Sequence, residues 1–176
     1  MSRLFNYAKQ NGVTVVVSAG NNGLDISHIP NLFKTYCDAP HVICVSATGP
    51  TASDNFFFGP FYEIDAPADY TNYGRSSISV AAPGGNSGGV VWAACTTTSL
   101  TLPFDCSGGT SVVGAAGTSM SAPHVSGLAA LLVEQYGRNP GRIKAAIQQG
   151  ADDLGQRGTD PFYGKGRINV GETVSY

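Results

Sequence analysis

The sequence predicts an α/β fold in which a mostly parallel β-sheet is flanked by helices. Residues 13–19 and 41–48 are continuous runs rich in β-branched side chains, which is typical of strands buried on both faces of a parallel sheet. Residues 2–10, 118–136 and 140–147 place apolar side chains at helical spacing. Buried strands that alternate with helices favour this architecture over an all-β or an all-α fold.

Length and composition limit the class of protein. A chain of 176 residues is about one domain and is long enough to bury a core. Ten basic and twelve acidic residues give a net charge of −2, without a run of either sign, so neither a nucleic acid nor an anionic membrane is expected as a partner. No apolar stretch approaches the roughly 20 residues that span a bilayer, and the first residues lack the apolar region of a signal peptide.

The first strand ends at a turn of possible functional importance. Residues 2–10 predict a short amphipathic helix that stops at Asn11-Gly12, and the strand at 13–19 then runs into the turn Gly20–Gly23. Ligands of open α/β sheets bind beyond the carboxyl ends of strands, which is where Asn21 lies. On the tetrapeptide alone, an ordinary turn residue is the favoured interpretation of Asn21.

The middle of the chain alternates loops with strands. Residues 24–40 predict a loop broken by two prolines, and residues 78–84 predict a third buried strand. Between them, residues 51–73 are aromatic and irregular. A loop of that length in a compact domain is usually functional or mobile. It is interpreted either as the wall of a substrate cleft or as a surface that packs against further structure.

The helix at 118–136 carries the strongest candidate for a nucleophile. Ser119 lies in its first turn, directly after a glycine, among backbone N–H groups that have no partner within the helix and that can receive an oxyanion. The alternative is that Ser119 only caps the helix. His124 follows five residues later, about 140° around the helix, so it is a poor base for Ser119. Asp152-Asp153 is interpreted as a solvated turn and not as a metal site.

Residues 117–127, GTSMSAPHVSG, closely resemble the catalytic-serine motif of the subtilisin-like serine proteases, the subtilases. Further segments resemble this family in the same order: 16–21 (VVSAGN), 41–48, 78–84 (ending in Ala-Pro-Gly) and 163–170. The resemblance implies a three-layer fold with a mostly parallel sheet flanked by helices, and a serine-type endopeptidase that acts on polypeptides.

The resemblance also assigns site residues. It implies that Ser119 is the nucleophile and that Asn21 donates to the oxyanion. It further implies that Ser18, Ala19 and Gly20, which precede Asn21, contact the substrate. Structural calcium is common in the family, but no cluster of oxygen ligands in this sequence is specific enough to predict a site. No metal and no cofactor are therefore expected.

The subtilase motifs for the other two triad members are absent. In the family the aspartate lies in D-S/T-G and the histidine in H-G-T-H, and neither string occurs here; His28 and His41 lie in no such motif. Serine is a weak nucleophile without an oriented base. Residues 1–176 are therefore expected to be the C-terminal half of a subtilase catalytic domain, with its N-terminal strands missing and inactive alone. Whether the chain is a fragment, half of a split gene or a relic stays open.

Two other functions are considered. The first is a non-catalytic subtilase-like interaction or relic domain; the presence of both Ser119 and Asn21 favours an enzyme over it. The second is a hydrolase that uses Ser87, because residues 85–89 fit the G-x-S-x-G pattern. That pattern requires a following helix, whereas residues 90–94 predict a strand.

Cysteine spacing indicates an oxidising compartment. The four cysteines form no C-x-x-C pair, so a zinc site is not predicted. Short loops favour the disulfides Cys37–Cys44 and Cys95–Cys106 among the three possible pairings, with free buried thiols as the alternative. We expect an extracellular or periplasmic protein.

Overall fold

The computed structural model describes residues 2–28, 36–95 and 112–175. Its helices and strands are α1 (Ser2–Gln10), β1 (Val15–Ser18), the 3-10 helix η1 (Tyr36–Asp38), β2 (Val42–Thr48), β3 (Ala52–Ser53), β4 (Phe61–Tyr62), β5 (Val80–Pro83), β6 (Val91–Ala94), β7 (Val112–Ala115), α2 (Thr118–Tyr136), α3 (Pro140–Gln149) and α4 (Val170–Val174).

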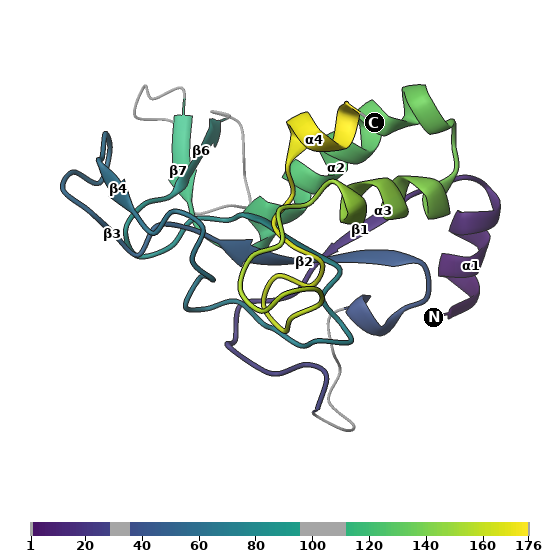
Figure 1. Cartoon of the computed structure of the whole chain (residues 1–176), viewed down its shortest axis with the longest axis horizontal. Coiled ribbons are helices and arrows are strands. Elements are labelled where there is room, and N and C mark those ends of the chain that lie inside the picture. The colour runs from purple at the N-terminus through teal and green to yellow at the C-terminus, as the bar shows by residue number, and fades with distance from the viewer. Residues whose placement is uncertain (1, 29–35, 96–111, 176) are drawn as a thin grey trace.

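A parallel sheet lies at the centre of the molecule, in the order β1-β2-β5 (Figure 1). Val15 pairs with Val42 and Val45 pairs with Val80, both in parallel register. β2 is buried along its whole length, whereas β1 is only half-buried. The predicted parallel sheet is confirmed, and β2 is buried as expected for residues 41–48. The expectation that residues 13–19 form a strand buried on both faces is wrong for β1, because β1 lies at the edge of the sheet.

The two faces of the sheet pack against different structure. Ile43 and Val45 face helices α2, α3 and α4, which lie together on one side of the sheet (Figure 1). Cys44 belongs to a smaller core on the other face, with η1 and Ile26. Successive side chains of a strand point to opposite faces, so β2 contributes to both cores. The core on the helix side consists of Ile43, Val45, Val80, Ala82, Val125, Leu128, Ala129, Leu132, Ile143, Ile147 and Ile168.

The two edges of the sheet differ. The outer edge of β5 is covered by a loop, because Ala81 donates its N–H to Gly166 O at 2.9 Å and accepts from Ile168 N at 2.9 Å. Within the described chain, β1 pairs with β2 and with no second strand. The free edge of β1 therefore presents backbone groups that another strand could pair with.

Two antiparallel hairpins lie at the opposite end of the molecule from α1 (Figure 1). The β3–β4 hairpin forms within the aromatic segment 51–73. In the second hairpin, β6 confirms the strand predicted at 90–94, so no helix follows Ser87 as a nucleophile elbow would need. Its partner β7 overlaps residues 96–114, whose threonine- and glycine-rich composition favours a connecting loop. A run of four residues with an internal glycine has little strand propensity, and β7 becomes a strand because β6 pairs with it.

The helix boundaries follow the local signals in the sequence. α2 ends at Tyr136 before Gly137, whose φ is 61°, and the Asn139 side chain caps α3 by accepting from Arg142 N at 3.1 Å. No helix within the described residues has the length and apolar character to cross a membrane.

One predicted disulfide is confirmed in full. Cys37 and Cys44 are bonded, with their Cα atoms 5.1 Å apart. Cys95 is also disulfide-bonded. Its predicted partner, Cys106, lies outside the described residues.

Candidate active site

Ser119 is exposed at the second position of α2, and a glycine makes its position possible. Gly117 caps the helix with φ 155° and ψ 159°, a region that only glycine adopts without strain. Its N–H donates to Gly84 O at 2.8 Å, which ties the start of α2 to the turn after β5. A Cβ at position 117 would lie 3.2 Å from Asn21 Nδ2. Glycine thus lets the Asn21 amide approach the start of the helix.

The first turn of α2 leaves one backbone donor free. Thr118 N–H donates to Asn21 Oδ1, and Met120 N–H donates to Gly117 O at 2.9 Å. Ser119 N–H has no partner within the part of the chain that the structure describes. A free donor at the positive end of a helix dipole is suited to binding negative charge.

Thr118 fixes the orientation of the Asn21 side chain. Asn21 Oδ1 accepts from Thr118 N at 2.9 Å and from Thr118 Oγ1 at 2.8 Å, and Thr118 Oγ1 itself accepts from Gly20 N at 3.1 Å. Because the amide oxygen is held on this side, the Nδ2 donor group points away from Thr118, and it donates to no described residue. Sequence reasoning assigned no role to Thr118, although it belongs to the serine motif.

A buried asparagine, also missed from the sequence, holds the turn that carries Asn21. Asn72 Oδ1 accepts from Asn22 N and Leu24 N, each at 3.0 Å, and its Nδ2 donates to Ala19 O at 2.9 Å. Asn72 N–H donates to Gly20 O at 2.9 Å. With four hydrogen bonds from one buried residue, the turn has little freedom. The segment 70–74 gave no local sign of this role.

Tyr70 supports the turn that holds Gly117. Its hydroxyl lies 2.9 Å from Gly84 O and 2.7 Å from Gly85 O. Burial raises the pKa of Tyr70 to about 12, against a small opposing effect of a hydrogen bond from the Gly117 backbone. The phenol is therefore a neutral donor at ordinary pH.

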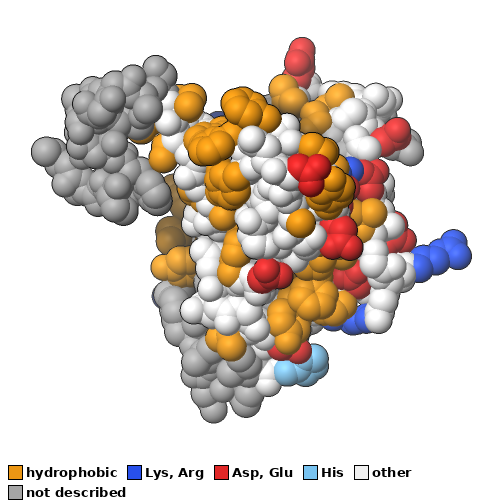
Figure 2. Space-filling view, turned by 90° about the vertical axis from the view of Figure 1, so that its left-hand side faces the viewer, with side chains coloured by type: hydrophobic (Ala, Val, Ile, Leu, Met, Phe, Trp, Pro, Cys, Tyr) orange, Lys and Arg blue, Asp and Glu red, His pale blue; other side chains and the backbone are white. Residues whose placement is uncertain are grey.

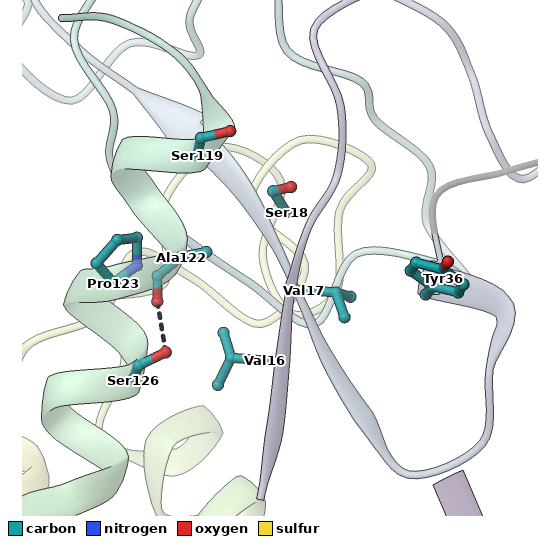
Figure 3. Close-up of a pocket in the computed structure, with 8 residues that line it drawn as sticks. All are labelled: Val16, Val17, Ser18, Tyr36, Ser119, Ala122, Pro123 and Ser126. Carbon is teal, nitrogen blue, oxygen red and sulfur yellow. Dashed lines mark hydrogen bonds between the residues drawn. The ribbon is translucent and has the colours of Figure 1, made fainter. Parts of the chain in front are cut away.

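A groove of about 690 Å³ runs between β1 and α2 beside Ser119, within the ~300–1,000 Å³ typical of ligand sites. Figure 3 shows Ser119 at the start of α2 and Ser18 on the facing strand. Of the residues predicted to contact substrate, only Ser18 lines the groove. The Ala19 side chain is fully buried, and Gly20 donates its N–H to Thr118 Oγ1. The groove is lined by Val16, Val17, Ser18, Tyr36, Ser119, Ala122, Pro123 and Ser126.

None of the three histidines, all of which the structure describes, lines this groove. His28 Nδ1 lies 2.7 Å from Asp25 Oδ2, and His124 Nδ1 lies 2.8 Å from Met120 O in its own helix. His41 is exposed at the entry to β2, with φ 68°. The structure thus brings Ser119 and Asn21 together and places no histidine beside them.

The Asp152-Asp153 pair has a structural environment. Asp152 accepts hydrogen bonds from Asn169 Nδ2 and Arg167 Nη2, which hold the pKa of its carboxyl below the usual range. Asp153 accepts from Gly158 N. Arg167 also pairs with Asp65 at 2.6 Å. Across the described ranges, no group of three or more His, Cys, Asp or Glu residues has the arrangement of a metal site.

Sequence comparison agrees with this geometry. The profile of the subtilase family matches residues 1–166, so the chain belongs to the subtilase family of serine proteases. It is 35% identical to the thermophilic serine proteinase of Bacillus sp. (strain AK1) over 97% of this chain and 33% of the relative. It is also 32% identical to thermitase of Thermoactinomyces vulgaris over the whole chain and 49% of the relative. The chain thus spans a third to a half of these curated relatives.

Solved structures show the same fold. A lanthipeptide protease superposes with a TM-score of 0.77 at 26% identity, over 99% of this chain and 54% of that protein. Fervidolysin from Fervidobacterium pennivorans, a keratinolytic enzyme related to subtilisin, superposes with a TM-score of 0.69 at 26% identity, over all of this chain and 24% of that protein. The predicted family and the α/β fold with a mostly parallel sheet are confirmed.

Proposed function

We propose that this chain provides the nucleophile and the oxyanion hole of a serine endopeptidase that cleaves polypeptides. A base takes the proton of the Ser119 hydroxyl as Oγ attacks the peptide carbonyl. The base then gives this proton to the leaving amine, the C–N bond breaks and an acyl-enzyme remains. The carbonyl oxygen becomes negative in the tetrahedral intermediate and accepts hydrogen bonds from Ser119 N–H and Asn21 Nδ2. One observation carries this proposal: Thr118 holds the amide oxygen of Asn21, which leaves its donor group free beside the start of α2.

Substrate binding is proposed along the groove beside Ser119. Ser18 lines it from β1. Ala19 and Gly20 follow on the path to Asn21, and their backbone groups bond to Val45, Asn72 and Thr118. The free edge of β1 could pair with an extended peptide or with a further strand of the enzyme, since either would satisfy its backbone groups.

The base and its orienting carboxylate are proposed to come from outside these 176 residues. The groove beside Ser119 contains no histidine, and the relatives extend well beyond the region that this chain matches. We therefore propose that residues 1–176 are the C-terminal half of a catalytic domain. The N-terminal half would dock on the free edge of β1 and leave the Ser119 end of the groove open to the substrate. Without that half, only the oxyanion-hole and binding contributions remain, about 10³–10⁴-fold over the uncatalysed rate.

An extracellular or periplasmic location is proposed on two observations. The Cys37–Cys44 disulfide is typical of an oxidising compartment. Relatives from Serratia marcescens and Xanthomonas campestris are named as extracellular proteases.

The test combines this chain with a subtilase N-terminal half that carries D-S/T-G and H-G-T-H. We expect hydrolysis of a fluorogenic peptide and labelling of Ser119 by a fluorophosphonate, and both should be lost in Ser119→Ala. Ser126→Ala is the matched control, because Ser126 lines the same groove but bonds to Ala122 O at 3.1 Å. If the combined protein folds but Ser119 stays unlabelled, the non-catalytic interaction domain is favoured. Full turnover by the isolated chain would refute the half-domain proposal.

A further inference from the structure

Five aromatic side chains form a surface patch that the proposed catalytic mechanism does not use. We define the aromatic patch as Phe56, Phe57, Phe58, Tyr62 and Trp92, which lie on the two hairpins and are all partly exposed. Phe57 is 60% exposed and Phe58 is 88% exposed. Figure 2 looks onto this end of the molecule and shows hydrophobic side chains gathered there, with Asp and Glu side chains between them. Contiguous exposed apolar surface of this kind marks an interaction site.

The patch is ordered by contacts between the hairpins. The ring centroids of Phe57 and Trp92 lie 5.7 Å apart. Those of Phe56 and Phe57 lie 5.6 Å apart, with the rings edge to face. Asn55 Oδ1 accepts from Phe57 N at 2.9 Å and from Phe58 N at 3.1 Å, which fixes the turn that presents these rings. A preformed aromatic surface loses little conformational entropy when it binds a partner.

The charge beside the patch is acidic. Residues 51–74 contain four Asp or Glu residues and no Lys or Arg. Asp54 Oδ2 accepts from Tyr62 Oη at 3.0 Å, and Glu63 Oε2 accepts from Thr51 Oγ1 at 2.7 Å. Neither carboxylate forms an ion pair with any residue that the structure describes. The patch thus complements a partner with apolar and basic side chains and repels an anionic membrane.

The patch lies within reach of Ser119 along one polypeptide. Trp92 pairs with Gly114 across the β6–β7 hairpin, and Gly114 precedes Ser119 by five residues. Five residues span at most about 18 Å, so no more than about six extended substrate residues separate Ser119 from Gly114. The start of α2 lies between this hairpin and β1 (Figure 1). A substrate in the β1 groove would therefore continue past Ser119 toward the patch.

We propose that the aromatic patch is a second substrate-contact site. It binds a segment of the polypeptide substrate that carries apolar and basic side chains, about six residues from the scissile bond on the side away from Ser18. The inference rests on the proposed protease function for its purpose, but binding at the patch does not require Ser119. A patch at this distance would let the enzyme discriminate between long substrates by residues that the groove beside Ser119 does not contact.

The first experiment measures binding without catalysis. The combined two-half protein carrying Ser119→Ala is titrated against a fluorescein-labelled nonapeptide of alternating leucine and lysine, and anisotropy is recorded. Replacing Phe57 and Phe58 by serine should weaken binding about tenfold or more, because exposed aromatic anchors dominate such contacts. Val170→Ala is the control, since Val170 is 46% exposed on α4 and lies outside the patch. It should leave the affinity unchanged.

Charge is tested separately with isosteric changes. The double variant Asp54→Asn, Glu63→Gln keeps the shape of the hairpin. It should lower the affinity for the lysine peptide several-fold and make that affinity less dependent on salt. A peptide with glutamate in place of lysine should bind at least tenfold more weakly than the lysine peptide to the unaltered patch.

The second experiment measures hydrolysis by the active combined enzyme. Two substrates share one cleavage site, and the leucine–lysine segment begins two or six residues beyond it. The serine variant at Phe57 and Phe58 should lower kcat/KM about tenfold for the six-residue spacing and leave a short peptide unaffected. The proposal would be overturned if the Phe57/Phe58 serine variant and the Asp54/Glu63 amide variant both bound the lysine peptide as tightly as the unaltered patch does. It would also be overturned by capture by neutral phosphatidylcholine vesicles without peptide binding, or by loss of the exposed rings on addition of the N-terminal half.

Discussion

Replacing Thr118 by valine tests whether its hydroxyl sets the orientation of Asn21. Valine keeps the size of the buried side chain but removes the donor to Asn21 Oδ1 and the acceptor for Gly20 N. A buried donor left without a partner costs about 1–3 kcal/mol, and Gly20 is only half-buried, so we expect a loss of about 1–2 kcal/mol in unfolding free energy. Urea denaturation measures this change.

The effect on catalysis should exceed the effect on binding. Asn21 retains the hydrogen bond from Thr118 N at 2.9 Å, so its donor group becomes less well aimed without being lost. We expect kcat of the combined enzyme to fall about tenfold, which corresponds to about 1.4 kcal/mol, with KM nearly constant. Thr118→Ser is the control, because it loses a methyl group and some stability but keeps the hydroxyl and should keep kcat. If Thr118→Val and Thr118→Ser have equal kcat, the hydroxyl does not orient Asn21.

Three further predictions concern the oxyanion hole, the disulfide and a buried phenol. Asn21→Ala in the combined enzyme should lower kcat by about 10²–10³ with little change in KM, a range that comes from subtilisin itself; a change confined to KM would mean that Asn21 only shapes the turn. Replacing Cys37 and Cys44 by serine should lower the unfolding free energy by about 2–3 kcal/mol in denaturant titrations, since the bond closes a short loop. The pKa of Tyr70 is raised to about 12 in the folded protein, chiefly by burial, so its contribution to stability is complete below pH ~10 and is lost as the pH rises toward 12. Unfolding at several pH values should show this loss, and Tyr70→Phe should remove it; an unchanged slope would contradict the assignment.

The main strands and the long helices could be predicted from the sequence because their signals are local, and the signals that make Ser119 the candidate nucleophile are local too. A β-branched run indicates a strand, and its burial then depends on its neighbours: β2 is buried, whereas β1 at the edge is half-buried. The serine motif brings the helix start, the preceding glycine and Ser119 together within a few residues. Asn139 caps α3 because its side chain reaches a backbone N–H three residues away. Short loops likewise made Cys37–Cys44 the favoured pairing, and it is present.

Contacts between distant segments were decided by the tertiary structure alone. Asn21 and Thr118 are 97 positions apart, and Asn72 reaches the Asn21 turn from about 50 positions away. Their side chains meet because parallel strands bring the ends of β1 and β5 to one edge of the sheet, where α2 begins. Neither Thr118 nor Asn72 stands in a pattern that reveals a partner at that separation.

The same reason accounts for β7 and for the aromatic patch. β7 has a weak strand pattern and is a strand because β6 pairs with it. Phe57 and Trp92 belong to segments that the sequence separates by 35 positions, and only the packing of two hairpins brings their rings together. Periodicity and motifs indicate interactions between residues that are close in the sequence. A long-range contact depends instead on the path of the whole chain. Local signals in the sequence therefore predict the long helices, the main strands and the candidate nucleophile Ser119, whereas the path of the whole chain brings Thr118 to Asn21 and Phe57 to Trp92.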